Sequence, residues 1–440
     1  MKETRIDTNC RIERIVFRGW RALHMSNGLC DVVIVPDIGG RVMAFDLGPY
    51  SFLWINERLA GKLFSADENM GGGSLADWRN YGGSKTWPAP QGWERPDQWH
   101  GPPDPVLDSG RYDVTLAEVV ADAAVVEVRS PADPLTGVQI TRRVTLHKDA
   151  SHVSLHLEMT NVSEEMRTWG LWDVVQLDAS RCGPGGSRDY CDSAWLYVPT
   201  NPQSRFARGY HVMFGDDDNP EWQPQTADGI LGIQYQYRLG KIGVDSHDGW
   251  LAFVNRDVDF AFCQRFTYFA DERYPDDGAT IECWTTGWGE PVGGYDWGAE
   301  QLYHVEAEVL GPLRTMRPGT AQSFDIEWNA ARCPGPIVGV TDAGCCSRRL
   351  QASRCGPAWR VQGTFGAFAR GSVDLVWLDD AHHEIVADPL GAADPLQVLE
   401  LDVVKTAPEE ARFVNLRLRS SSSIGGLLDE ASLTDSLAVR

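Results

Sequence analysis

The chain has 440 residues, 42% of them hydrophobic, and a formal net charge of -22 at pH 7. This length and composition allow a large buried core and more than one domain. The acidic balance argues against a nucleic-acid backbone or an anionic membrane as the main partner, so we expect neither.

The N-terminal stretch MKETRIDTNCRIERIVFRGW interrupts every apolar run with a charge, so it has no signal-peptide core. No stretch approaches the roughly 18 apolar residues of a membrane span. The ten cysteines include no CxxC pair, and a disulfide is conceivable between Cys182 and Cys191, which flank a Gly-rich loop. Without an export signal, however, we expect a cytoplasmic protein with reduced thiols.

Strand patterns dominate the chain. Residues 31–47 (DVVIVPDIGGRVMAFDL) form two β-rich runs joined at a Gly-Gly turn. Residues 138–146 and 152–160 alternate apolar and polar side chains, which indicates strands with one buried face. Further strands are expected at 167–177, 250–255, 260–269, 280–286 and 302–310. No long amphipathic helix is evident, and strands at this spacing predict a large antiparallel sandwich.

A domain boundary is predicted near residues 331–335, after an expected strand at 321–328. The tail from about residue 337 has strand patterns of its own, at 359–365, 372–378, 396–404 and 413–419. We therefore expect one large β domain over residues 1–332 and a small β-sandwich domain of unknown role over residues 337–440.

An ordered series of motifs runs through residues 10–330. In chain order the motifs are PDIGGRVMAFDL, FLWIN, NYGGSKTWPAPQGW, GPPDPVLDSGRYDV, TGVQITRRVTL, TNVSEEMRTWGLWDVVQL and HVEAEVLGPLRTMRPGTAQSFDIEW. This series resembles the galactose-mutarotase-like superfamily, and within it the branch of uncharacterised mutarotase-like proteins. The resemblance implies an all-β chain whose large domain is an antiparallel β-supersandwich. It also implies a concave groove that binds a carbohydrate or sugar derivative, and an isomerase of carbohydrate metabolism.

The chain departs from the catalytic pattern of that superfamily. Its characterised aldose mutarotases use two histidines and one glutamate to move protons at the sugar ring. The matching positions here hold Lys85 and the pair Trp172–Asp173. We therefore predict mutarotase- or epimerase-like acid–base chemistry without the histidine pair, with Lys85, Asp173 and Glu306 as catalytic candidates. The alternatives are a non-catalytic carbohydrate-binding protein, or a recruited scaffold that performs elimination or metabolite tailoring.

Lys85 is the lone cation in the segment NYGGSKTWPAPQGW. Beside aromatic rings its pKa would fall, and it could act as a general acid or bind a sugar carboxylate or phosphate. A surface lysine at a turn is the structural alternative. Tyr81, Trp87 and Trp93 in the same segment are candidate sugar-binding residues, because aromatic faces stack on sugars and prolines hold the rings in place. Packing onto the sandwich is the alternative for them.

Two strands carry further candidates. Alternation puts Trp172 and Asp173 on opposite faces, so one faces the core and the other the groove. A groove-facing Asp173 would be a base, and otherwise it would pair with an arginine. His304, Glu306 and Glu308 share one strand face. Two carboxylates close together there would form a base site, because like charges raise the pKa of one of them. The structural alternative is that both carboxylates are solvated strand residues.

Arg41, after a Gly pair, and His247, in GVDSHDGW, are the remaining candidates for substrate binding. Their structural alternatives are an ion pair and a hairpin turn. The acidic segment GDDDNPEW lacks the Gly and the distal Glu of an EF-hand loop, so we predict no metal site. Nucleotide-binding and nucleophile motifs are absent from the sequence, so we predict no cofactor. The resemblance implies a small carbohydrate or sugar derivative as the partner.

Overall fold

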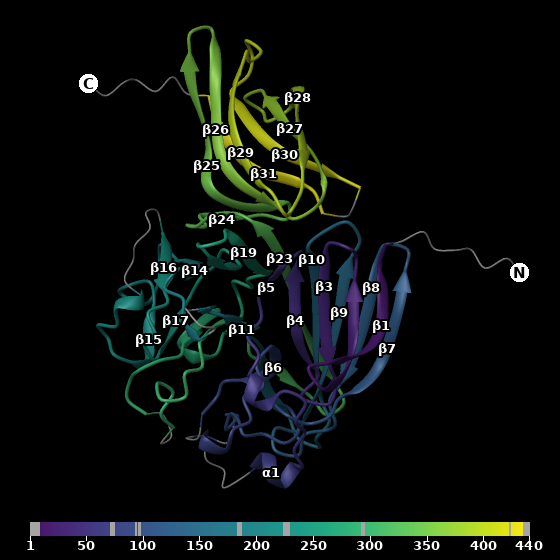
Figure 1. Ribbon diagram of the computed structural model, residues 1–440. Helices are drawn as coiled ribbons and strands as arrows, with labels where there is room; N and C mark the ends of the chain where they lie inside the picture. Colours follow the sequence, from purple (N-terminus) through teal and green to yellow (C-terminus); the bar gives the residue numbers. More distant parts are fainter. Residues whose placement is uncertain are drawn as a thin grey trace, which may run out of the picture.

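The computed structural model describes residues 9–70, 75–92, 95, 98–182, 187–222, 229–291, 295–421 and 424–433. Nearly all regular structure in them is antiparallel β-sheet, in one large sandwich followed by one small sandwich (Figure 1). The predicted fold class is confirmed. No helix among these residues is long and apolar enough to cross a membrane.

The first large sheet mixes N-terminal strands with strands from the middle of the chain. Its order is β1 (Arg11–Phe17), β2 (Trp20–Ser26), β3 (Cys30–Val35), β4 (Arg41–Leu47), β6 (Ser84–Ala89), β11 (Arg167–Asp178), β21 (His304–Leu310), β20 (Ile281–Thr285), β17 (Gly240–Val244) and β15 (His211–Gly215). The short strands β5 (Tyr50–Ser51) and β22 (Arg314–Met316) pair with β4 and β11. The sheet therefore brings side chains from residues 84 to 310 together on one face.

The second large sheet packs against the first. Its order is β16 (Ile230–Gln234), β14 (Ala194–Pro199), β18 (Trp250–Asn255), β19 (Phe260–Phe266), β23 (Ala321–Arg332), β10 (His152–Asn161), β9 (Val138–His147), β8 (Ala123–Arg129) and β7 (Asp113–Val120). Phe45 of the first sheet meets Phe262 and Trp328 of the second at ring-centroid distances of 5.8 and 6.0 Å. These contacts belong to the main hydrophobic core, which lies between the two sheets.

Short elements connect the strands of the large sandwich. They are β12 (Ser180–Cys182), β13 (Arg188–Tyr190), α1 (Ala66–Met70) and the 3-10 turns η1 (Glu57–Leu59), η2 (Leu75–Asp77), η4 (Pro220–Trp222) and η5 (Asp276–Gly278). All ten cysteines are free thiols, so the disulfide considered between Cys182 and Cys191 is not formed.

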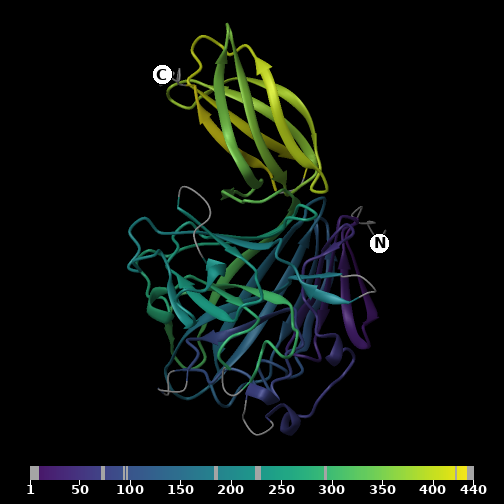
Figure 2. The same cartoon turned by 60° about the vertical axis from the view of Figure 1, so that its left-hand side comes forward.

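The small sandwich has two sheets of four strands each. One is β24 (Gly339–Val340), β25 (Gly344–Cys355), β26 (Ala358–Ala367) and β29 (Val398–Lys405), and the other is β28 (Glu384–Ala393), β27 (Gly371–Leu378), β30 (Phe413–Ser420) and β31 (Gly426–Ser432). It stands at one end of the large body in both views (Figure 1, Figure 2). Its core continues into Ala252 and Cys263 of the second large sheet. The small sandwich therefore does not cover the outer face of the first sheet.

Candidate functional site

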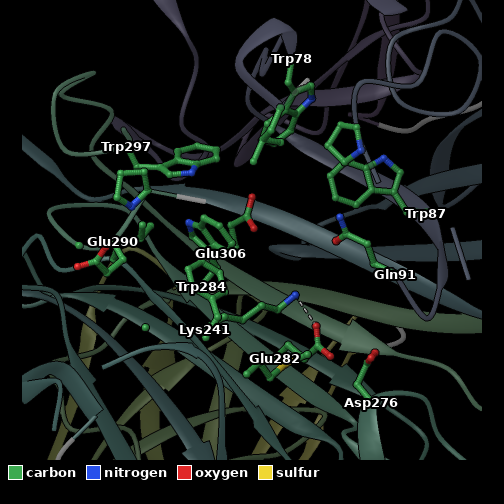
Figure 3. Close-up of a pocket in the computed structure, with 18 of the residues that line it drawn as sticks. Trp78, Trp87, Gln91, Lys241, Asp276, Glu282, Trp284, Glu290, Trp297 and Glu306 are labelled. Carbon is green, nitrogen blue, oxygen red and sulfur yellow. Dashed lines mark ion pairs between the residues drawn. The ribbon is translucent and has the colours of Figure 1, made fainter. Parts of the chain in front are cut away.

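A cavity of about 650 Å³ lies on the outer face of the first sheet (Figure 3). This volume is within the range of pockets that bind small molecules, roughly 300–1,000 Å³. Strands β6, β11, β17, β20 and β21 form its floor, and strand β15 and loops form its walls. Its aromatic lining consists of Trp78, Trp87, Trp172, Trp284 and Trp297.

Strand register places the floor side chains together. On β11, Val174 stands opposite Lys85 on one side and Glu308 on the other. Gln176, two residues along, stands opposite Glu306. Because side chains two apart on a strand share a face, these groups lie on the same side of the sheet. Strand β20 extends this face, with Glu282 opposite Glu308 and Trp284 opposite Glu306.

A glycine pair sets the start of β6. Gly82 and Gly83 have φ values of 97° and 71°, which glycine adopts most readily. A Cβ on Gly82 would lie 2.3 Å from the Trp54 carbonyl oxygen, and one on Gly83 would lie 2.4 Å from that of Val42. This close approach allows β6 to enter the sheet and fixes Lys85 two residues later.

Glu306 is the carboxylate at the centre of the floor. Its Oε1 accepts hydrogen bonds from Lys85 Nζ at 3.1 Å and Gln176 Nε2 at 2.7 Å. Burial alone would raise its pKa, but the cations of Lys85 and Lys241 oppose burial and the pKa is lowered. Within the described part of the chain, Oε2 has no hydrogen-bond partner, and Glu306 lines the cavity. The site thus presents an ionised carboxylate with one available oxygen.

Lys85 is completely buried and is not a lining residue. Its Nζ lies 4.7 Å from the ring centroid of Trp87 and 5.6 Å from that of Trp78. Burial lowers its pKa, and Glu306 opposes this effect. The lysine therefore acts on the cavity through Glu306, not by contact with a ligand.

A second charged cluster adjoins the first. Lys241 Nζ lies 2.6 Å from Glu282 Oε2 and 3.0 Å from Glu308 Oε2, and 4.4 Å from the ring centroid of Trp172. Trp172 also donates its indole N–H to Glu308 at 2.8 Å. Burial would lower the pKa of Lys241, but the two carboxylates raise it above its ordinary value. The lysine is a permanent cation within this cluster.

The carboxyls around Lys241 hold protons readily. Burial raises the pKa of Glu282 to about 7 and that of Glu308 to about 8. Burial also raises the pKa of Asp276. Glu282 and Asp276, both in the lining, are therefore more easily protonated than exposed carboxyls.

Asp173 lies on the opposite face of β11 from Trp172. Trp172 lines the cavity, whereas Asp173 is fully buried between the large sheets. Its Oδ1 lies 3.6 Å from Arg142 Nη2 and accepts hydrogen bonds from Ser84 and Thr86. Burial raises its pKa to about 6, against the influence of Arg142. The structure thus shows the arginine-paired alternative for Asp173, because strand alternation turns it away from the groove.

Arg41 and Tyr81 are also internal and do not line the cavity. Arg41 pairs with Asp108 at 2.5 Å and donates to the Gly82 carbonyl at 2.9 Å. Its guanidinium lies 5.8 Å from the ring centroid of Tyr81, which packs against Trp20. Arg41 therefore forms an internal ion pair, which was the structural alternative to a role in substrate binding.

The remaining candidates divide into two groups. His304 and Glu308 are buried on the floor strand behind the lining, and burial lowers the pKa of His304 to about 3, which keeps it neutral. His247 lies in the turn after β17, stacked on Tyr268 at 4.1 Å, and is not a lining residue. Trp93 lies outside the described residues.

Several lining residues were not among the candidates from sequence. They are Trp78, Gln91, Lys241, Asp276, Glu282, Trp284 and Trp297. Glu282 and Trp284 stand two apart on an expected strand, the same spacing that identified Glu306 and Glu308, so that signal was present. Trp297 lies in a loop, where no periodicity marks it. The described residues include no group of three or more His, Cys, Asp or Glu side chains arranged to hold a metal ion.

Comparisons with known proteins give a family and distant structural likenesses. The family model described as "Domain of unknown function (DUF4380)" matches residues 21–330. No curated protein sequence matches the chain. A galactose mutarotase-like protein from Clostridium acetobutylicum is similar with a TM-score of 0.45 and 10% identity, over 73% of this chain and 99% of that one. A galactose mutarotase-like protein from Lactobacillus casei is similar with a TM-score of 0.43 and 11% identity, over 70% of this chain and 99% of that one.

Proposed function

We propose that this chain, which belongs to the family described as Domain of unknown function (DUF4380), binds a sugar or sugar derivative in the cavity and catalyses proton transfer on it. The observation that carries the proposal is Glu306, an ionised carboxylate with one available oxygen on an aromatic-walled floor. The motif order that resembles the galactose-mutarotase-like superfamily supports the same ligand class.

The cavity lining suits a polyhydroxylated ring. Indole faces pack against the CH faces of sugars, and five tryptophans supply such surfaces. The indole N–H groups of Trp87, Trp284 and Trp297 are buried without a hydrogen-bond partner among the described residues. Because these nitrogen atoms have almost no exposed surface, a ligand meets the indole rings and not their N–H groups. A few polar groups in an apolar lining are typical of small-molecule sites.

The carboxyls supply an acid and a base. The pKa of Glu306 is lowered and that of Glu282 is raised to about 7, so at neutral pH one accepts a proton and the other can give one. They occupy diagonal positions on β21 and β20, a relation that separates the two residues by about 7–8 Å. A single sugar ring can therefore lie between them.

The proposed reaction opens and recloses the ring. Glu306 takes the proton of the anomeric hydroxyl, and Glu282 gives a proton to the ring oxygen. The bond from the anomeric carbon to the ring oxygen breaks, and a carbonyl forms at that carbon. The reverse transfers close the ring on either face, which interconverts the anomers and returns both carboxyls to their starting states. Lys85 and Gln176 hold Glu306 in place throughout.

The test is the equilibration rate of anomerically pure aldoses, followed by proton NMR with full-length protein. Glu306→Gln is expected to lower the protein-dependent rate by about 10²- to 10⁴-fold, the usual contribution of a general base. Glu118→Gln is the matched control, because Glu118 is exposed on β7 of the other sheet. A Glu306→Gln variant that is as active as the parent would contradict the proposed base.

The same samples separate catalysis from binding. Quenching of tryptophan fluorescence reports sugar binding because five tryptophans line the cavity. If sugars quench the fluorescence but no aldose equilibrates faster with protein than without it, the chain is a carbohydrate-binding protein and the catalytic part of the proposal is wrong.

A further inference from the structure

Carboxylates outnumber cations in the cavity. Among the described residues, the lining holds one ammonium, that of Lys241, and five carboxyl groups, those of Asp216, Asp276, Glu282, Glu290 and Glu306. Even without Glu282 and Asp276, whose raised pKa values favour protonation, three carboxyl groups face one ammonium, so the lining favours a positive group.

The cations near the cavity are already engaged. Lys241 lies within 3.0 Å of oxygens from both Glu282 and Glu308. Lys85 is completely buried and bonds to Glu306. An anionic ligand would have to displace one of these buried pairs, which leaves a carboxylate uncompensated at high cost. This arrangement disfavours a sugar carboxylate or phosphate, which the sequence suggested as a partner for Lys85.

Several carboxylate oxygens remain available. Asp216 and Glu290 are exposed at the cavity rim, and neither forms an ion pair within the described part of the chain. Inside, Glu306 presents its Oε2. Figure 3 shows Glu290, Trp284 and Trp297 on one side of the cavity, with Trp87 and Gln91 on the other. A positive group near Glu290 would thus also lie near indole rings.

The indole rings favour the same charge. Trp284 and Trp297 pack edge to face, with centroids 5.2 Å apart and an interplanar angle of 67°. The faces of indole rings attract ammonium groups. The protein already uses this contact twice on the same floor, for Lys85 on Trp87 and for Lys241 on Trp172.

From these observations we infer that the ligand is a sugar or cyclic polyol that carries an amino group, bound as its ammonium ion. The sugar ring packs against the indole rings of the lining, and the ammonium lies against the rim carboxylates and indole faces. The inference rests on the proposed function, since it names the substrate class of the same cavity.

The test compares matched sugars. Glucose, galactose and mannose are each titrated at pH 7 as the neutral sugar, the 2-amino-2-deoxy sugar, its N-acetyl form and the uronic acid, by calorimetry on the full chain. At least one amino sugar is expected to bind about tenfold or more tightly than its neutral partner, as one screened ion pair would give. The N-acetyl form, which has no charge, is expected to lose this preference, and the uronic acid is expected to bind most weakly.

Variants assign the preference to the rim. The double variant Asp216→Asn, Glu290→Gln is expected to remove most of the amino-sugar preference and to leave neutral-sugar affinity nearly unchanged, whereas Glu118→Gln keeps both. If a neutral sugar or a uronic acid binds as tightly as its amino partner, the inference is wrong while the proposed sugar site stands. If none of these sugars binds at millimolar concentration, both proposals are overturned.

Discussion

Two buried ion pairs lie on opposite faces of the first large sheet. On the cavity face, Lys85 of β6 pairs with Glu306, and on the core face Arg142 pairs with Asp173 of β11. Both pairs are almost entirely buried, and burial perturbs the pKa values of their members. They differ in access: Glu306 has an oxygen toward the cavity, whereas Asp173 is enclosed by Arg142, Ser84 and Thr86. A perturbed carboxyl is therefore a candidate for catalysis only where a ligand can reach it.

The largest effect should follow from breaking the core pair. Arg142→Met leaves Asp173 buried without its cation and is expected to lower the free energy of unfolding by about 3–5 kcal/mol in urea at pH 7. Arg143→Met is the matched control, because Arg143 is the next residue on β9 and forms a half-exposed pair with Glu127. The control is expected to cost about 0–1 kcal/mol. Equal losses in both variants would contradict the structural role of the Arg142–Asp173 pair.

The two pairs should also respond oppositely to pH. The folded-state pKa of Asp173 is raised from 3.8 to about 6, so its contribution to stability is present below pH 3.8 and is lost as the pH rises toward 6. The folded-state pKa of Glu306 is lowered from 4.5, so its contribution is present above pH 4.5 and is lost as the pH falls through the lowered value. Each pKa unit corresponds to about 1.4 kcal/mol.

The measurement is the free energy of unfolding between pH 3 and pH 7 for the parent, Asp173→Asn and Glu306→Gln. Relative to the parent, Asp173→Asn is expected to gain stability as the pH rises from about 4 to 6, by up to about 3 kcal/mol. Glu306→Gln is expected to lose stability, relative to the parent, as the pH rises through the acid range. If the stability of both variants relative to the parent changed with pH in the same direction, the two carboxyls would occupy equivalent environments.

The smallest effect should come from removing the cation behind Glu306. Lys85→Met is expected to raise the pKa of Glu306, because burial is then opposed by one cation fewer. The acid limb of the pH–rate profile should move to higher pH by about one pH unit. The rate should therefore fall roughly tenfold on the low-pH side and much less at high pH. An equal loss of rate at every pH would indicate that the lysine has a structural role only. Arg143→Met is the control and is expected to keep the pH–rate profile of the parent.

The small C-terminal sandwich supplies none of the described residues that line the cavity. Its core continues into the second large sheet through residues such as Ala252 and Cys263, whereas the cavity lies on the first sheet. A role for this domain in sugar recognition would need a surface of its own.

The sequence by itself determined most of the strands and which side chains share a face of a strand. Alternation placed Trp172 and Asp173 on opposite sides of one strand and His304, Glu306 and Glu308 on one side of another. Each of these properties depends on neighbours in the chain, so the sequence contains it directly. The Gly pair before Lys85 was visible in the sequence, but the strand that follows it, β6 (Ser84–Ala89), was not among the expected strands.

Only the tertiary structure decided which of those faces holds the cavity. A period of two separates two sides of a strand but does not say which side a second sheet will cover. Sheet order then brought Lys241 and Glu282 from distant parts of the chain beside Glu308, and put Arg142 of the opposite sheet against Asp173. These contacts exist because non-sequential strands pair and two sheets pack, which local sequence patterns do not encode.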